Sequence, residues 1–140
     1  MTDLHVVYLA LGSNLCDAEK NILNATELIG SKVGRIVSRS SLLETRPWGF
    51  SSPNNFINAV VCCETTLDPR QLLQTTQEIE RFMGRTEKSH DGEYKDRLID
   101  IDILLYDDLE VNEPDLKIPH PLMWKRDFVL IPLREIYKRC

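Results

Sequence analysis

The feature that most constrains the fold is the order in which strand and helix patterns follow one another. Four segments are apolar and rich in residues that favour strands: residues 4–11, 33–45, 55–66 and 99–106. Apolar residues at helical spacing lie between the first two segments and again between the last two. The predicted order is therefore β-α-β-β-α-β, followed by a short extended piece and a helical tail that ends near Tyr137.

This order is the signature of a ferredoxin-like α+β sandwich, in which two helices cover one face of an antiparallel sheet. The length of 140 residues fits one domain, so residues 1–140 are expected to fold together, with the short C-terminal helical tail added to the sandwich. Many unrelated activities share this fold, so the chemistry has to be argued from individual residues.

The ends of the two helices are marked by specific residues. Asp68 is a typical N-cap, Pro69 suits the first helical position, and Gln71 completes a capping-box pattern. We expect Gly84 to end this second helix and Gly30 to end the first. Residues 86–97, after the second helix, are polar and aperiodic. They predict a mobile loop of a length usually associated with function.

Charge and hydropathy exclude several classes of partner. The formal net charge is −5 and the isoelectric point is near 5.2, which disfavours binding to nucleic acids and anionic membranes. The N-terminus lacks the basic lead of a signal peptide, and no window holds the ~18 apolar residues of a membrane span. We expect a cytoplasmic monomer that acts on small molecules and has no nucleic-acid or membrane partner.

The most informative residues are two aspartates in the last predicted strand. Asp100 and Asp102 share one face of that strand, and their Cα atoms are expected to lie about 6.6 Å apart. Two carboxylates at this spacing can hold one Mg²⁺ jointly or bridge a pair of ions. The alternative is a strand with one solvated face. Against it, Leu104 continues the aspartate face, and that face carries no cation to offset the repulsion.

Several cations near the predicted loop and tail could bind phosphate groups. They are Arg85, Lys88, Lys95, Arg97, His120, Lys125 and Arg126. Each alone is better explained as a solvated charge, but together with two carboxylates they suit a triphosphate bound with Mg²⁺. The chain has no P-loop motif, which excludes that class of nucleotide-binding site.

An aromatic side chain and an amide are predicted to lie side by side in the third strand. Phe56 and Asn58 are two residues apart and therefore face the same way. This pair suits a flat heterocycle, because the ring stacks on Phe56 while its edge bonds to the amide. A core phenylalanine beside a turn-forming asparagine is the alternative.

Several ordered blocks together resemble a known family. The most specific is RLIDIDIL at residues 97–104, and the match extends from YLALGSNL at 8–15 to IPL at 131–133. Supporting blocks are FINA at 56–59, QEIE at 77–80, GR at 84–85, PH at 119–120 and RDF at 126–128. On these residues, the chain resembles 6-hydroxymethyl-7,8-dihydropterin pyrophosphokinase of folate biosynthesis.

The resemblance implies a reaction and a set of roles. The β,γ-pyrophosphoryl group of ATP would pass to the pterin hydroxymethyl oxygen with release of AMP, on a ferredoxin-like fold. Asp100 and Asp102 would bind two Mg²⁺ ions, and Arg97 would join them as a catalytic residue. The implied ATP site comprises Gln77, Glu80, Arg97, Ile103, His120 and Arg126. The implied pterin site comprises Thr45, Pro47, Trp48, Phe56, Asn58 and Phe128. Glu87 and Lys95-Asp96 depart from the family pattern, so the resemblance leaves open which of Lys88, Tyr94 and Lys95 would contact ATP.

Two other functions fit parts of the sequence. A ferredoxin-like RNA-binding module has the same topology, but the acidic isoelectric point and the lack of an aromatic, basic RNA-binding strand count against it. A metal-dependent phosphohydrolase could use the same two aspartates. It would release phosphate from ATP without a pterin, so a phosphate assay separates it from the pyrophosphokinase.

Overall fold

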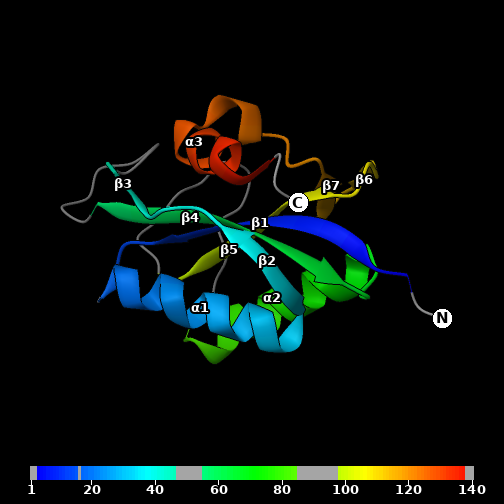
Figure 1. Cartoon of the computed structure of the whole chain (residues 1–140), viewed down its shortest axis with the longest axis horizontal. Helices are drawn as coiled ribbons and strands as arrows, with labels where there is room; N and C mark the ends of the chain where they lie inside the picture. Colours follow the sequence, from blue (N-terminus) through cyan, green and yellow to red (C-terminus); the bar gives the residue numbers. More distant parts are fainter. Residues whose placement is uncertain (1–2, 16, 47–54, 85–97, 138–140) are drawn as a thin grey trace.

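The fold is built on one antiparallel sheet. The structure, a computed structural model, describes residues 3–15, 17–46, 55–84 and 98–137. The sheet order is β2-β4-β1-β5, and β3 also pairs with β4 (Figure 1). The strands are β1 (His5–Ser13), β2 (Gly34–Arg39), β3 (Leu43–Thr45), β4 (Phe56–Thr65) and β5 (Asp100–Tyr106). The predicted loop 86–97 lies outside the described residues.

Helices cover both faces of this sheet. Helices α1 (Ala18–Lys32) and α2 (Pro69–Phe82) lie on one face, and α3 (Asp127–Ile136) lies on the other (Figure 1). The predicted ferredoxin-like α+β sandwich is confirmed, with the tail helix as a third layer. None of the helices in the described part of the chain is both long and apolar enough to span a membrane.

A small hairpin connects the sheet to the third layer. It consists of β6 (Val111–Glu113) and β7 (Leu116–Ile118), which pair antiparallel. The chain then passes through a cis peptide bond before Pro119 and a short 3-10 helix, η1 (Met123–Lys125), before α3 begins. The extended piece predicted before the tail is therefore a two-stranded hairpin.

Side chains from the two faces of the sheet form two apolar clusters. Because neighbouring residues of a strand point to opposite faces, each strand contributes to both clusters. Under α1 and α2 the buried residues include Val7, Leu9, Leu11, Ile22, Ile29, Val61, Leu72, Ile79, Ile101 and Ile103. Under α3 they are Tyr8, Ala10, Val60, Cys62, Leu104, Met123, Val129, Leu133 and Ile136. The second cluster explains why Leu104 continues the face that carries the aspartates.

The predicted strand at residues 33–45 is divided into β2 and β3. At the interruption the Ser40 N–H donates to the Val60 carbonyl, and the Ser40 hydroxyl accepts from the Val60 N–H, both at 2.9 Å. The hydroxyl thus takes the place of a backbone carbonyl. Next to it, the Ser41 N–H and hydroxyl donate to the Glu135 carboxylate at 2.8 and 2.7 Å. The division therefore anchors the far end of α3.

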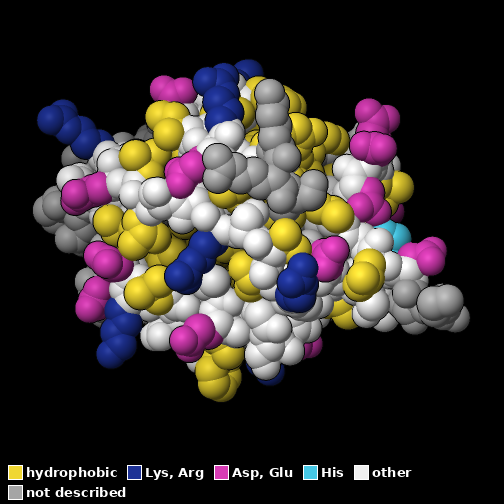
Figure 2. Space-filling model, viewed as in Figure 1, with side chains coloured by type: hydrophobic (Ala, Val, Ile, Leu, Met, Phe, Trp, Pro, Cys, Tyr) yellow, Lys and Arg dark blue, Asp and Glu magenta, His cyan; other side chains and the backbone are white. Residues whose placement is uncertain are grey.

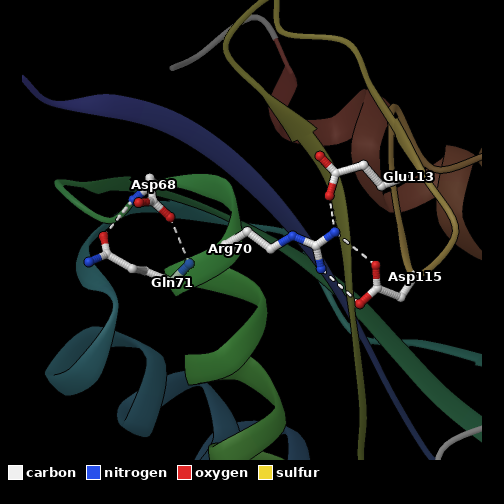
Figure 3. Close-up of polar contacts among 5 residues, drawn as sticks. All are labelled: Asp68, Arg70, Gln71, Glu113 and Asp115. Carbon is white, nitrogen blue, oxygen red and sulfur yellow. Dashed lines mark hydrogen bonds and ion pairs between the residues drawn. The ribbon is translucent and has the colours of Figure 1, made fainter.

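The predicted helix boundaries are confirmed for α2 but not for α1. Asp68 and Gln71 form the capping box (Figure 3). Gly84 follows the helix with φ of +103°, a conformation that favours glycine. Gly30, in contrast, does not end α1. The helix continues to Lys32, and the Val33 N–H bonds to the Ile29 carbonyl at 2.9 Å because Val33 packs into the core.

An arginine at the start of α2 holds the β6–β7 hairpin. Arg70 donates to both oxygens of Asp115 at 2.7 and 2.8 Å and also bonds to Glu113 (Figure 3). The hydrogen bond between Arg70 and Asp115 raises the pKa of Arg70 and lowers that of Asp115. The hairpin, and with it the segment that leads to α3, is thereby fixed relative to α2.

Figure 2 shows the charged side chains on one face of the molecule. Acidic and basic side chains are interspersed over this face of the molecule.

The capping box predicts a measurable effect on stability. Asp68→Ala leaves the Gln71 N–H without its side-chain acceptor and should lower the free energy of unfolding by about 1 kcal/mol. Asp68→Asn, which is also a favoured cap, should retain most of the stability. Urea denaturation of the wild type and the two variants measures the change in the free energy of unfolding for each substitution. Equal losses in the two variants would contradict a capping role.

Candidate active site

The site is built on the face of the sheet that α3 covers. In the central strand β1, Gly12 pairs with Asn58 of β4 on one side and with Asp100 of β5 on the other. One pleat away, Ala10 pairs with Val60 and with Asp102. Gly12 and Ala10 thus separate the two aspartates from β4. Because both are small, they leave a hollow in the middle of the sheet face.

This hollow is part of an open pocket of about 510 Å³, counting the space that is open to solvent. Apolar and aromatic walls with a few polar groups are typical of a small-molecule site. The pocket is lined by Ala10, Leu11, Gly12, Thr45, Arg46, Phe56, Asn58, Asp100, Asp102, Arg126, Phe128 and Val129. The lining therefore combines residues of four strands or strand ends with the beginning of α3.

The two aspartates form the acidic side of the pocket. Asp100 is 8% exposed and Asp102 is partly exposed. Within the described residues, no group of three His, Cys, Asp or Glu side chains could hold a metal ion without other ligands. Carboxylate oxygens are ligands that Mg²⁺ prefers, and Mg²⁺ commonly takes one or two of them together with substrate phosphates. The donor set therefore fits Mg²⁺ bound together with a phosphate ligand.

The opposite side of the pocket presents an aromatic ring and a fixed amide. Phe56 and Asn58 are both buried. The Asn58 amide nitrogen donates to the Thr45 hydroxyl at 2.8 Å and reaches the Leu43 carbonyl at 3.5 Å. These contacts orient the amide. A ring and an oriented amide on one wall suit a planar heterocycle with polar edges.

The beginning of α3 contributes a buried cation and a second aromatic ring. Arg126 is 7% exposed, and its guanidinium carbon lies 5.6 Å from the centroid of the Phe128 ring. Burial lowers the pKa of Arg126 to about 10, so the side chain remains charged at neutral pH. A guanidinium at the wall of a pocket is a suitable hydrogen-bonding and charge partner for a phosphate group.

The structure brings together seven of the residues predicted for the site. Those that line the pocket are Thr45, Phe56, Asn58, Asp100, Asp102, Arg126 and Phe128. Four others lie elsewhere: Gln77 and Glu80 on α2, Ile103 in the core under α1 and α2, and His120 after β7. Pro47, Trp48 and Arg97 lie outside the described residues. The ligand contacts of all these residues remain predictions.

Sequence reasoning missed the small residues in the middle of the site. We expected the first strand to end before Gly12, whereas β1 continues through it to Ser13. The signal was present in the pattern. Ala10 and Gly12 alternate with the apolar Leu9 and Leu11, as two small residues on one face of a strand would. Arg46 and Val129 were missed because neither has a distinctive sequence pattern.

A pair of carboxylates, a buried arginine and an aromatic, amide-bearing wall suit an enzyme that transfers a phosphate-containing group to a flat heterocycle. The family can be named from sequence comparison. The sequence model of the 7,8-dihydro-6-hydroxymethylpterin-pyrophosphokinase (HPPK) family matches residues 8–138, and the chain belongs to this family.

Relatives and solved structures agree with this assignment. The chain is 50% identical over 132 residues to the 2-amino-4-hydroxy-6-hydroxymethyldihydropteridine pyrophosphokinase of Porphyromonas gingivalis, which covers 94% of this chain and 90% of that protein. It is 42% identical over 130 residues to the enzyme of the same name from Aquifex aeolicus, covering 93% and 79%. The wild-type HPPK-DHPS of Plasmodium falciparum has the same fold, with a TM-score of 0.75 at 17% identity. That alignment covers 96% of this chain and 41% of the Plasmodium chain.

The position of Gly12 predicts that the pocket tolerates no side chain there. A Cβ atom at Gly12 would lie 3.3 Å from the Asn58 carboxamide oxygen and 3.9 Å from the Phe56 ring. Gly12→Ala should therefore displace the amide and weaken pterin binding ~5–150-fold, the equivalent of about 1–3 kcal/mol of overpacking. Fluorescence titration with hydroxymethylpterin measures this affinity.

Gly30→Ala is the matched control for this substitution. Its Cβ would meet only Ile36, at an ordinary 3.6 Å, and would lie in α1, far from the pocket lining. It should leave pterin binding unchanged and stabilise the helix by about 1 kcal/mol. Wild-type pterin affinity in Gly12→Ala would show that the hollow at Gly12 is not part of the binding site.

Proposed function

We propose that this chain transfers the β,γ-pyrophosphoryl group of ATP to the hydroxymethyl oxygen of 6-hydroxymethyl-7,8-dihydropterin, with release of AMP, as a step of folate biosynthesis. The family assignment supports the reaction. The observation that carries the roles of the residues is the single pocket that contains Asp100 and Asp102 together with Phe56, Asn58 and Arg126.

The reaction is a displacement at the β-phosphorus of ATP. The pterin hydroxyl oxygen forms a bond to this phosphorus, and the bond to the oxygen of the α-phosphate breaks, so AMP leaves. The chain's contribution is to place the two substrates in line and to neutralise charge. Asp102, the more exposed of the two aspartates, is the candidate to accept the hydroxyl proton.

Asp100 and Asp102 would hold Mg²⁺, with two ions as the family resemblance implies. When bound, Mg²⁺ supplies charge neutralisation for the triphosphate, which otherwise repels its nucleophile. Arg126 adds a fixed positive charge at the same pocket. Arg126 lies immediately before α3 and contacts the Phe128 ring. It would therefore link the phosphate side of the pocket to the aromatic side.

The pterin would lie between the sheet and α3. Phe56 belongs to β4 and Phe128 to α3, so the two rings approach the pocket from different layers. The Asn58 amide, oriented by Thr45, would form hydrogen bonds with the polar edge of the pterin ring. The family assignment favours this function over the RNA-binding module and the phosphohydrolase.

Asp100→Asn and Asp102→Asn should each lower AMP formation ~100-fold or more, because losing a metal ligand removes several kcal/mol of charge stabilisation. The fold should persist or become slightly more stable, since asparagine preserves the shape and relieves repulsion between neighbouring carboxylates. The measurements are AMP formation at several Mg²⁺ concentrations and the melting temperature without ligands.

Asp108→Asn is the matched control for both variants. Asp108 is exposed in the turn after β5, and the substitution removes the same charge outside the pocket. It should retain wild-type turnover. Near wild-type turnover of both pocket variants at the same Mg²⁺ concentration would overturn the assignment of the metal site.

Phe56→Ala and Phe128→Ala should weaken pterin binding much more than ATP binding. Each removes one stacking face, worth ~1–3 kcal/mol by analogy with base–aromatic stacking. Phe56 is buried, so its loss should also lower the melting temperature, whereas the partly exposed Phe128 should matter less to stability. Separate titrations with pterin and with an ATP analogue test this. Loss of stability with unchanged pterin affinity would assign Phe56 to the core alone.

A further inference from the structure

Glu80 is a buried acidic residue that does not line the pocket. Glu80 lies near the end of α2 and is only 3% exposed. A carboxylate is rarely buried to this degree unless it is paired or hydrogen-bonded, because desolvation of the charge is costly. One carboxylate oxygen, Oε2, accepts a hydrogen bond of 2.8 Å from the backbone N–H of Ile101.

The position of Ile101 makes this contact significant. Ile101 is the residue between Asp100 and Asp102, and it pairs with Leu11 across the sheet. In an antiparallel pair, backbone groups of successive residues turn alternately toward the partner strand and away from it. The Ile101 N–H is turned away from β1, and β5 is the last strand of the sheet. Glu80 therefore satisfies a backbone donor on the edge of β5 that faces away from β1.

Ile101 is held twice from the helix side of the sheet. Its side chain is 2% exposed in the cluster under α1 and α2, and its N–H is bound by Glu80 of α2. The same edge of β5 is held a second time, where the His120 N–H donates to the Leu104 carbonyl at 3.1 Å. Asp100 and Asp102 are the chain neighbours of Ile101, so fixing Ile101 also fixes the backbone that carries them. Their side chains leave the strand on the opposite face, toward the pocket.

We propose that Glu80 is a positioning residue that fixes the metal-binding aspartates through the backbone of Ile101. This inference rests on the proposed role of Asp100 and Asp102 as Mg²⁺ ligands. It differs from the role that the family resemblance implies, a contact with ATP. A side chain that is 3% exposed and bonded to the strand offers little surface to a nucleotide. Hydrogen bonds from a backbone N–H to a carboxylate are about twice as strong as neutral ones, which suits a fixing role.

Two substitutions of Glu80 distinguish the effect of its side-chain length from the effect of its charge. Glu80→Gln keeps the length of the side chain and an acceptor oxygen but removes the charge. Glu80→Asp keeps the charge but shortens the side chain by one methylene group, so the carboxylate no longer reaches the Ile101 N–H. If Glu80 acts by positioning, Glu80→Gln should change the Mg²⁺ dependence of AMP formation less than Glu80→Asp does. If it acts through its charge alone, the order should be reversed.

The readouts are the Mg²⁺ concentration that gives half-maximal AMP formation and the inhibition constant of added AMP. AMP is a nucleotide that lacks the transferred phosphates, so it reports nucleotide contacts rather than the metal site. In Glu80→Asp the half-maximal Mg²⁺ concentration should rise ~10-fold or more, the usual effect of losing an outer-shell support of a metal ligand. The inhibition constant of AMP should stay within about twofold of the wild-type value, and Glu80→Gln should show the smaller Mg²⁺ effect.

Glu78→Asp and Glu78→Gln are the matched controls, since Glu78 is exposed on the same helix. Both should behave as wild type, and melting temperatures show that each variant is folded at the assay temperature. A weaker inhibition by AMP with unchanged Mg²⁺ dependence would overturn the proposal in favour of a nucleotide contact. Unchanged Mg²⁺ dependence with only a lower melting temperature would overturn it in favour of a purely structural role.

The same assay on Asp100→Asn and Asp102→Asn distinguishes a failure of the positioning role of Glu80 from a failure of the metal site. If these variants lose activity and Glu80→Asp keeps the wild-type Mg²⁺ dependence, only the positioning role of Glu80 fails. If the aspartate variants also keep the wild-type Mg²⁺ dependence, the metal site itself fails.

Discussion

The site depends above all on the antiparallel pairing of β1 with its two neighbours, β4 and β5. The register places Gly12 between Asn58 and Asp100, and it places Ala10 beside Asp102. Side chains alternate between the two faces of a strand, so a shift of β5 by one residue would turn both aspartates into the apolar cluster under α1 and α2. The isoleucines of β5 disfavour this shift, because it would move Ile101 and Ile103 out of that cluster. The apolar core therefore determines where the acidic pair lies.

Much of the fold could be predicted because its patterns are local. The alternation of isoleucine and aspartate in β5 shows which residues share a face, and the Asp68 capping box marks the start of α2 from four consecutive residues. The errors arose where distant contacts decide the structure. Gly30 remains within α1 because Val33 packs into the core, and Ser40 divides a strand because its hydroxyl bonds to β4. Neither partner can be found from the neighbouring sequence.

The same distinction applies to the site. Residues two apart in one strand, such as Phe56 and Asn58, could be predicted to act together. The pairing that places them beside Gly12 and, across it, Asp100 depends on sheet order, and the sequence pattern suggests this order only through the fold class. The resemblance to a family named Glu80 but not its hydrogen bond to Ile101. Only the geometry distinguishes a residue that touches a ligand from one that holds the strand beneath the ligand.

The three-layer arrangement also has a consequence for how the protein is made. Synthesis proceeds from the N-terminus, so β1, β4 and β5 leave the ribosome before Arg126 and Phe128. A nascent chain that has completed the sheet with α1 and α2 has both aspartates in place. It still lacks the third layer, which contributes the buried cation and one of the aromatic rings. Until the last helix docks, the apolar cluster beneath it is open to water. A ligand that contacts both the sheet and this helix would therefore favour the fully folded protein over intermediates that lack the third layer.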